Sequence, residues 1–133
     1  MKKKGNSDKD KETLFLSEEC TIEEFVDAKF IAFYFSAYWC PPCRNFLGML
    51  KDFYNEVNID ARQCEIIYVS DDKNDKDFQA HYAMMPWYAF PFGDPRIKQV
   101  KKKYTVIGVP LLVVVEASTG MLVTSRGRKD IHE

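Results

Sequence analysis

Apolar side chains along this chain form three short runs and one long helical stripe. The runs over residues 29–35, 65–69 and 111–115 are almost continuously apolar, which is typical of strands whose sheet is covered on both faces. Between the first two runs, apolar residues recur at helical spacing from Phe46 to Val57, which predicts an amphipathic helix packed on the sheet. Because strand, helix and strand follow in that order, we expect a right-handed parallel βαβ unit.

Three further helices are predicted from capping residues and apolar spacing. Thr21 and Glu24 stand at the spacing of a capping box, so a short helix should run from there to the first strand. A polar loop follows the second strand, and a helix is expected after it over residues 77–84. Asp94 should cap a last helix, because the proline that follows it suits the first helical position.

The remaining segments predict connections and a hairpin. Prolines interrupt the apolar residues 85–92, so this stretch should form an ordered connection, with Trp87 in the core, and not a helix. Residues 118–120 are Ser-Thr-Gly, a turn that returns residues 121–124 antiparallel to the third strand. Together these elements predict an α/β fold with a mixed central sheet and helices on both faces.

The chain is long enough for one domain with a hydrophobic core. It has 133 residues, of which 46% are hydrophobic, and a net charge of −1. A charge so near zero argues against binding to nucleic acid or to an anionic membrane. Residues 1–12 are polar and charged, and we expect them to form a disordered tail ahead of a single domain over residues 13–133.

The sequence also bears on the cellular compartment. The basic residues 2–4 are not followed by an apolar segment, so no signal peptide is recognisable, and the longest apolar runs are too short to span a bilayer. With only four cysteines, the chain lacks the cysteine density of small secreted domains. We therefore expect a reducing compartment, the cytoplasm and also the nucleus, where paired cysteines serve redox or metal chemistry more often than structural bridges.

The candidate chemistry lies in the sequence Trp39-Cys40-Pro41-Pro42-Cys43, shortly after the first strand. The two prolines suit the opening turn of a helix, where a missing N–H is not needed. Cys40 should then lie at the positive end of the helix, which stabilises a thiolate and lowers the pKa of the thiol. Cys43, one turn further on, should be more buried and can release a mixed disulfide. This pattern predicts thiol–disulfide exchange with Cys40 as nucleophile and Cys43 as resolving thiol.

A zinc site is the main alternative for this motif. Zinc sites use four ligands, often from a second closely spaced pair, whereas Cys20, Cys64, His81 and His132 are scattered along the chain. We therefore favour redox chemistry and expect neither a metal nor another cofactor, since no flavin or nucleotide motif is recognisable. Cys20 and Cys64 are interpreted as structural residues that behave as small hydrophobes.

Several segments resemble the thioredoxin superfamily and, within it, the tryparedoxins and nucleoredoxins. Residues 33–44, FYFSAYWCPPCR, resemble the YFSAxWCPPCR segment of these proteins. Residues 85–92 look like their MPW-containing loop, and residues 120–128 resemble the G-x-x-x-T-x-x-G-R ending of nucleoredoxins. The resemblance covers roughly residues 20–128 and implies a thioredoxin-like fold with protein disulfide reductase activity.

The resemblance also implies where substrate is bound. It implies a cis Val109–Pro110 bond that faces the cysteines, with the Val109 backbone able to pair with an extended substrate chain. Trp39 either fills the core or, as we favour from its place before the nucleophile, offers a flat apolar contact beside it. Pro41, between the cysteines, belongs to the same candidate set. The implied partners are disulfide-containing proteins, and the implied electron donor is a low-molecular-weight thiol or a reductase.

The chain departs from the family pattern at three places. Tyr34 stands where thioredoxins carry a buried aspartate before the first cysteine, so the proton acceptor for Cys43 is not identified. Asp71 follows Ser70, where tryparedoxins usually have a tryptophan. After Arg128, which we interpret as a surface residue, few residues follow, and we expect the closing C-terminal helix of the family to be missing.

Two functions from different classes stay open on the sequence. The first is a cytosolic protein disulfide reductase with a role in cell redox homeostasis. The second is a redox-sensitive binding module of nucleoredoxin type, in which the state of the cysteine pair controls a partner interaction and turnover is slow.

Overall fold

The computed structural model describes residues 28–61, 63–125 and 127. Within them, five strands form one sheet in the order β3-β2-β1-β4-β5. The strands are β1 (Phe30–Ser36), β2 (Cys64–Ser70), β3 (Tyr88–Ala89), β4 (Leu111–Glu116) and β5 (Leu122–Thr124). The helices are α3 (Pro41–Val57), α4 (Asp75–Tyr82) and α5 (Pro95–Lys103).

The central strand β1 pairs with β2 in parallel and with β4 in antiparallel orientation. The outer strands continue this arrangement, since β3 is parallel to β2 and β5 is antiparallel to β4. Helix α3 lies between β1 and β2 in the chain, as the strand–helix–strand pattern predicted. These pairings confirm the predicted mixed sheet and its returning strand.

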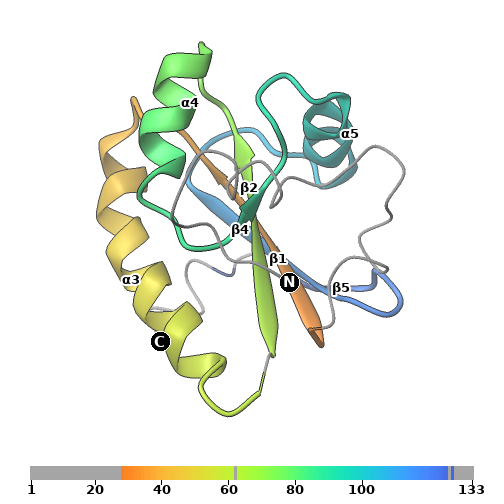
Figure 1. Ribbon diagram of the computed structural model, residues 1–133. Helices are drawn as coiled ribbons and strands as arrows, with labels where there is room; N and C mark the ends of the chain where they lie inside the picture. The colour runs from red at the N-terminus through yellow and green to blue at the C-terminus, as the bar shows by residue number, and fades with distance from the viewer. Residues whose placement is uncertain (1–27, 62, 126, 128–133) are drawn as a thin grey trace.

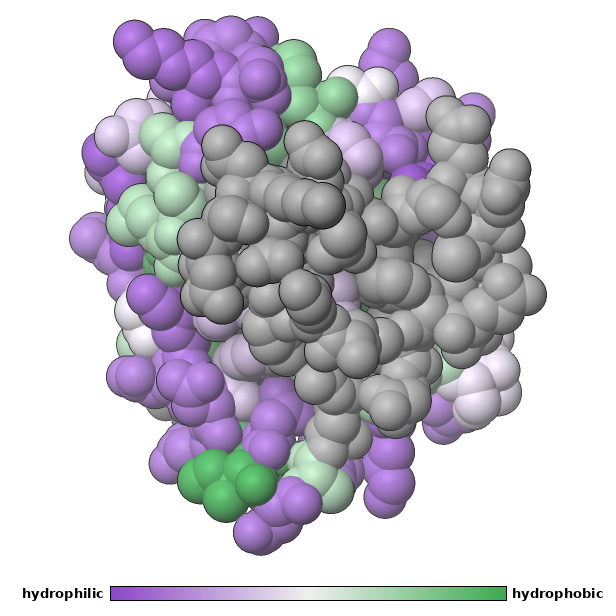
Figure 2. All heavy atoms as spheres, viewed as in Figure 1, coloured by the Kyte–Doolittle hydropathy of each residue, from purple (hydrophilic) through white to green (hydrophobic). Residues whose placement is uncertain are grey.

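The sheet separates two hydrophobic layers. Figure 1 shows α3 and α4 on one side of the sheet and α5 on the other. Alternate residues of β1 point to opposite faces, so Ala32 and Tyr34 pack with α3 and α4, while Phe33 and Phe35 pack on the side of α5. The expectation of helices on both faces is thus confirmed. Hydrophilic residues make up most of the coloured surface in Figure 2.

Two predicted segments differ in detail from the structure. Helix α4 begins two residues earlier than predicted, because the side chain of Asn74 caps it by accepting a hydrogen bond from the Asp77 N–H at 2.9 Å. The connection over residues 85–92 contains β3, which sequence analysis missed because a strand of two residues has no periodic pattern. Trp87 is fully buried, as predicted.

Some predictions fall on residues that the structure does not describe. These are the polar tail over residues 1–12, the helix expected after Thr21, and the chain after Arg128, where a closing helix was expected to be missing. Cys20 and His132 also lie outside the described residues. No described helix has both the length and the apolar character that crossing a membrane requires.

Candidate active site

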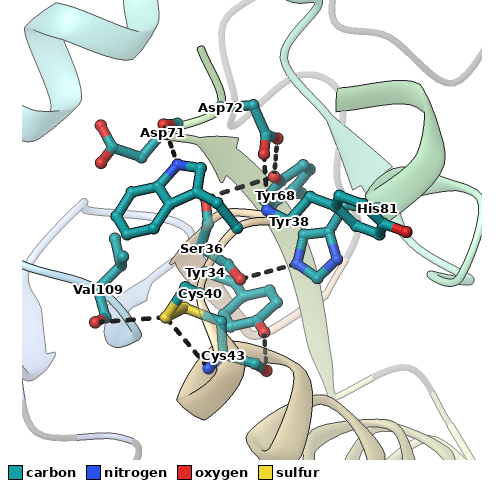
Figure 3. The surroundings of a disulfide bond; sticks show 11 residues. Tyr34, Ser36, Tyr38, Cys40, Cys43, Tyr68, Asp71, Asp72, His81 and Val109 are labelled. Carbon is teal, nitrogen blue, oxygen red and sulfur yellow. Dashed lines mark hydrogen bonds between the residues drawn. A yellow bond between two sulfur atoms is a disulfide. The ribbon is translucent and has the colours of Figure 1, made fainter. Parts of the chain in front are cut away.

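The cysteine pair lies at the N-terminus of α3, where the chain leaves β1 and turns into the helix (Figure 3). Cys40 is the N-cap residue, and its sulfur accepts a hydrogen bond from the Cys43 N–H at 3.3 Å. The two cysteines form a disulfide with their Cα atoms 5.2 Å apart. A helix N-terminus offers unpaired N–H groups and the positive end of the helix dipole. After reduction of the disulfide, this position favours the thiolate form of Cys40.

The two cysteines differ in exposure. Cys43 is fully buried, whereas 5% of Cys40 is exposed. Ala37 and Val109 pack against the pair, so Cys40 is less exposed than its place at the start of a helix suggested. The order of burial agrees with the expectation that an external disulfide meets Cys40 first.

The loop before β4 contributes a main-chain group to the site. The peptide bond between Val109 and Pro110 is cis, as the resemblance implied. The carbonyl oxygen of Val109 lies 3.8 Å from the sulfur of Cys40. A main-chain acceptor therefore lies beside the sulfur of the more exposed cysteine.

Trp39 lies on the surface beside the disulfide and not in the core. The residue is 46% exposed, and its indole N–H donates to the main-chain oxygen of Asp71 at 3.2 Å. The Lys73 ammonium lies 5.5 Å from the ring centroid, within the range of a cation–π contact. The carboxylate of Asp71 in turn pairs with Lys101 of α5 at 2.5 Å. These contacts hold an exposed tryptophan ring next to the cysteines.

Two further apolar residues are exposed on segments that contribute to the site. Pro41 is exposed at the start of α3, and Ile107 is 96% exposed in the loop that carries Val109. Sequence analysis did not single out Ile107. The available signal was an isoleucine in a short glycine-containing loop just before the proline that precedes β4.

A cluster of buried polar side chains lies behind the disulfide (Figure 3). The Tyr34 hydroxyl donates to the main-chain oxygen of Cys43 at 3.2 Å. The Ser36 hydroxyl oxygen lies 2.9 Å from His81 Nε2, where either group can be the donor. Burial raises the pKa of Tyr34 to about 12, although its hydrogen bond with Ser36 acts in the opposite direction. At neutral pH, Tyr34 is therefore a proton donor in this cluster.

Asp72 closes the cluster on the side of β2. Its carboxylate accepts hydrogen bonds from the Tyr68 hydroxyl at 2.5 Å, the Ser70 hydroxyl at 2.7 Å and the Tyr38 N–H at 2.7 Å. The Tyr68 hydroxyl also lies 3.3 Å from the main-chain oxygen of Ser36. Burial, followed by the hydrogen bond with Asp72, raises the pKa of Tyr68.

Sequence analysis missed this cluster and considered His81 only as a scattered zinc ligand. The signal was present in α4, because His81 is three residues after Phe78 and precedes Tyr82, so all three share the core face of the helix. Within the described residues, no group of three or more His, Cys, Asp or Glu side chains gathers in a metal-binding arrangement. Cys64 is a buried free thiol, and burial together with the charge of Glu65 raises its pKa to about 12.

Comparison with known proteins places this geometry in a family. The family model described as Thioredoxin-like matches residues 27–121. The chain belongs to this family. Among similar proteins, probable nucleoredoxin 1 of Arabidopsis thaliana is 41% identical over 100 residues, which make up 75% of this chain and 17% of that protein.

Solved structures of the thioredoxin-like family match both the fold and the sequence. Tryparedoxin I from Leishmania major superposes with a TM-score of 0.73 at 43% identity, covering 80% of this chain and 74% of that one. Tryparedoxin II complexed with glutathionylspermidine superposes with a TM-score of 0.75 at 35% identity, covering 86% and 78% of the two chains. The resemblance to the nucleoredoxins and tryparedoxins is thus confirmed. The Cys40–Cys43 pair fits the CxxC redox site of thioredoxin-like oxidoreductases.

Proposed function

We propose that this thioredoxin-like domain reduces disulfide bonds in proteins. The observation that carries the proposal is the position of Cys40, which caps α3, accepts a hydrogen bond from the Cys43 N–H and is the more exposed residue of the pair. A thiolate is the attacking species in disulfide exchange, and this position favours it. The proposed substrates are proteins because the exposed residues Trp39 and Pro41 flank Cys40 and offer an apolar contact surface.

The reaction proceeds in two exchanges. The Cys40 thiolate attacks one sulfur of the substrate disulfide, so that a mixed disulfide forms and the first substrate thiolate leaves. The Cys43 thiolate then attacks the Cys40 sulfur, which forms the Cys40–Cys43 disulfide and releases the second substrate thiolate. Two electrons pass from the dithiol to the substrate, and an external thiol returns the pair to the reduced state.

The substrate contacts that we propose surround the Cys40 sulfur. Trp39 and Pro41 are exposed residues that flank Cys40 in the chain, and Ile107 is exposed two residues before Val109. The Val109 carbonyl, 3.8 Å from the Cys40 sulfur, can accept a hydrogen bond from the main chain of an extended substrate. Main-chain pairing and apolar contact place few demands on substrate sequence, which suits a reductase of many proteins.

A low-molecular-weight thiol is the electron donor that we propose. Support comes from the related tryparedoxin II, whose structure is complexed with glutathionylspermidine. The electron donor of the present chain is tested by offering glutathione, glutathionylspermidine or a thioredoxin reductase system to the oxidised protein. The donor is the one that restores two free thiols per oxidised pair at the highest rate.

Insulin reduction tests the proposed activity. With excess thiol donor, the wild-type protein should reduce insulin in many turnovers, and Cys40→Ser should lower the rate to that of the donor alone. Cys64→Ala is the matched control, because Cys64 is a buried thiol outside the pair, and it should keep the wild-type rate. Wild-type reduction no faster than the donor alone contradicts the proposal.

A redox-gated binding module is the second candidate. It is favoured by the exposed ring of Trp39 beside the disulfide, which offers a contact surface whether or not turnover occurs. If the wild-type protein oxidises once per molecule without turnover, and binds a partner in only one redox state, this function replaces the reductase.

A further inference from the structure

His81 is a buried imidazole with an unusual set of neighbours. Its side chain is fully buried, and its Nε2 atom lies 2.9 Å from the hydroxyl oxygen of Ser36, which is also fully buried. Its Nδ1 atom has no hydrogen-bond partner among the described residues. The ring packs edge-on against Tyr68 and is tilted against Tyr38. Unpartnered buried polar atoms are rare, and a catalytic or redox role is one of the explanations for them.

The second exchange of the proposed reaction needs a proton acceptor. Cys43 attacks as a thiolate, and its burial disfavours the charged form until the proton has somewhere to go. Tyr34 is the nearest titratable group by hydrogen bonding, but its raised pKa keeps it protonated. Asp72 already accepts from Tyr68, Ser70 and the Tyr38 N–H. Neither group offers an open acceptor to the Cys43 proton.

Hydrogen bonds lead from His81 through Ser36 and Tyr34 to the main-chain oxygen of Cys43, the residue whose thiol must lose the proton. Tyr34 donates to the Cys43 main chain and hydrogen-bonds with Ser36. Tyr34 and Ser36 are two residues apart in β1 and therefore lie on one face of the sheet. Figure 3 shows the Ser36 hydroxyl pointing to His81. Ser36 thus links the imidazole to the surroundings of the dithiol.

We propose that His81, through the Ser36 hydroxyl, takes the proton of the Cys43 thiol during the second exchange. The inference rests on the proposed function. The Cys43 proton moves to the Ser36 oxygen while the Ser36 hydroxyl proton moves to His81 Nε2. The Cys43 thiolate then attacks Cys40, the Cys40–substrate bond breaks, and the substrate thiolate leaves. The imidazolium later gives its proton to solvent. Because His81 acts through Ser36 in this proposal, it is a positioning residue for the Ser36 hydroxyl.

The charges that face His81 agree with this role. Burial is the largest influence and lowers the pKa of the imidazole, the Asp72 carboxylate raises it, and the Arg44 guanidinium lowers it. Tyr38 and Tyr68 are titratable groups in ring contact with the imidazole. At neutral pH the imidazole is therefore neutral and able to accept a proton, and the nearby carboxylate favours the transient imidazolium.

A single turnover with the aromatic disulfide dithiobisnitrobenzoate separates the two exchanges. When the reagent is substoichiometric to reduced protein, attack by Cys40 releases a first nitrothiobenzoate, and attack by Cys43 releases a second. His81→Gln keeps a polar group toward Ser36 but cannot store the proton, and Ser36→Ala removes the link but keeps the imidazole. Each variant should slow the second release by about a hundredfold near pH 7, the lower end of general-base effects. The first release should stay within about twofold of wild type.

The pH profile distinguishes proton transfer from a structural effect. The second release should be almost independent of pH above about 6.5 in wild type, since the neutral imidazole predominates there. In both variants it should rise about tenfold per pH unit up to the pKa of the thiol, because only hydroxide then removes the proton. The double variant should be no slower than either single one. Cys43→Ser should abolish the second release, and His132→Gln serves as the matched histidine substitution.

The possible outcomes separate this inference from the proposed function. Wild-type rates and profiles in both single variants overturn the role of His81 while leaving the reductase intact. Loss of the second release in His81→Gln but not in Ser36→Ala overturns the route through the hydroxyl. Failure of the first release in wild type overturns the proposed function itself, and with it this inference. If His81→Gln does not fold, Ser36→Ala with an unchanged melting temperature decides the question.

Discussion

Asn58 joins the end of α3 to the start of β2, and its removal should lower the stability of the whole domain. The side-chain NH₂ group donates to the main-chain oxygens of Tyr54 and Cys64 at 2.8 and 3.0 Å. The side-chain oxygen accepts from the N–H groups of Gln63 and Cys64 at 2.8 and 3.1 Å. One amide thus satisfies four main-chain groups where the helix that carries the cysteines meets the sheet.

The size of the effect follows from the number and burial of these bonds. At about 1 kcal/mol for each net hydrogen bond, loss of all four in Asn58→Ala sets an upper value of about 4 kcal/mol. Asn58 is only half-buried, so water replaces some partners, but the main chain of Cys64 belongs to a buried residue and stays poorly solvated. We therefore expect a loss of about 2–3 kcal/mol in the free energy of unfolding.

Urea denaturation of the oxidised protein measures this loss. The midpoint should fall while the slope with denaturant stays constant, because the same surface is exposed on unfolding. Asn55→Ala is the matched control, since Asn55 is exposed in the same helix, and it should change stability by less than about 0.5 kcal/mol. An Asn58→Ala protein as stable as the control refutes the reasoning.

Three further predictions concern the site and its surroundings. Cys43→Ser should accumulate mixed disulfides with partner proteins, visible on non-reducing gels. Cys40→Ser should trap none, because the buried Cys43 does not reach a substrate. The reverse pattern contradicts the roles assigned to the two cysteines. Burial lowers the pKa of His81 in the folded protein. Below about pH 6.5 the imidazole of the unfolded chain therefore binds a proton that the folded chain does not. The free energy of unfolding should decrease as the pH falls below this value. His81→Gln should flatten this dependence in melting experiments, and an unchanged slope argues against it. Asp94 caps α5. Burial acts to raise the pKa of its carboxyl group, but the hydrogen bonds and charge of Arg96 outweigh burial and lower the pKa, so the stabilisation by this cap should be present at neutral pH and lost below about pH 4. Asp94→Ala should cost about 1 kcal/mol at pH 7 and weaken the acid dependence of stability, which urea titrations at neutral and acidic pH can show.

The sequence alone was sufficient for the main strands, for α3 and for the position of the cysteine pair. Strands β1, β2 and β4 are continuous apolar runs because their sheet is covered on both faces. Each run can therefore be recognised from its own residues. The prolines after Cys40 likewise specify a helix start locally. The cis bond at Val109 was different, because only the resemblance to a family implied it.

Tertiary structure decided the features that depend on contacts between distant residues. Ser36 and His81 are 45 residues apart, and no local pattern in either segment indicates that they meet. The surface position of Trp39 depends on the main-chain oxygen of Asp71 beyond β2, so sequence analysis could only favour it over a place in the core. The periodicity of a sequence indicates which face of a helix or strand is apolar. The packing of these elements decides which polar groups meet inside the molecule and how burial shifts their pKa values.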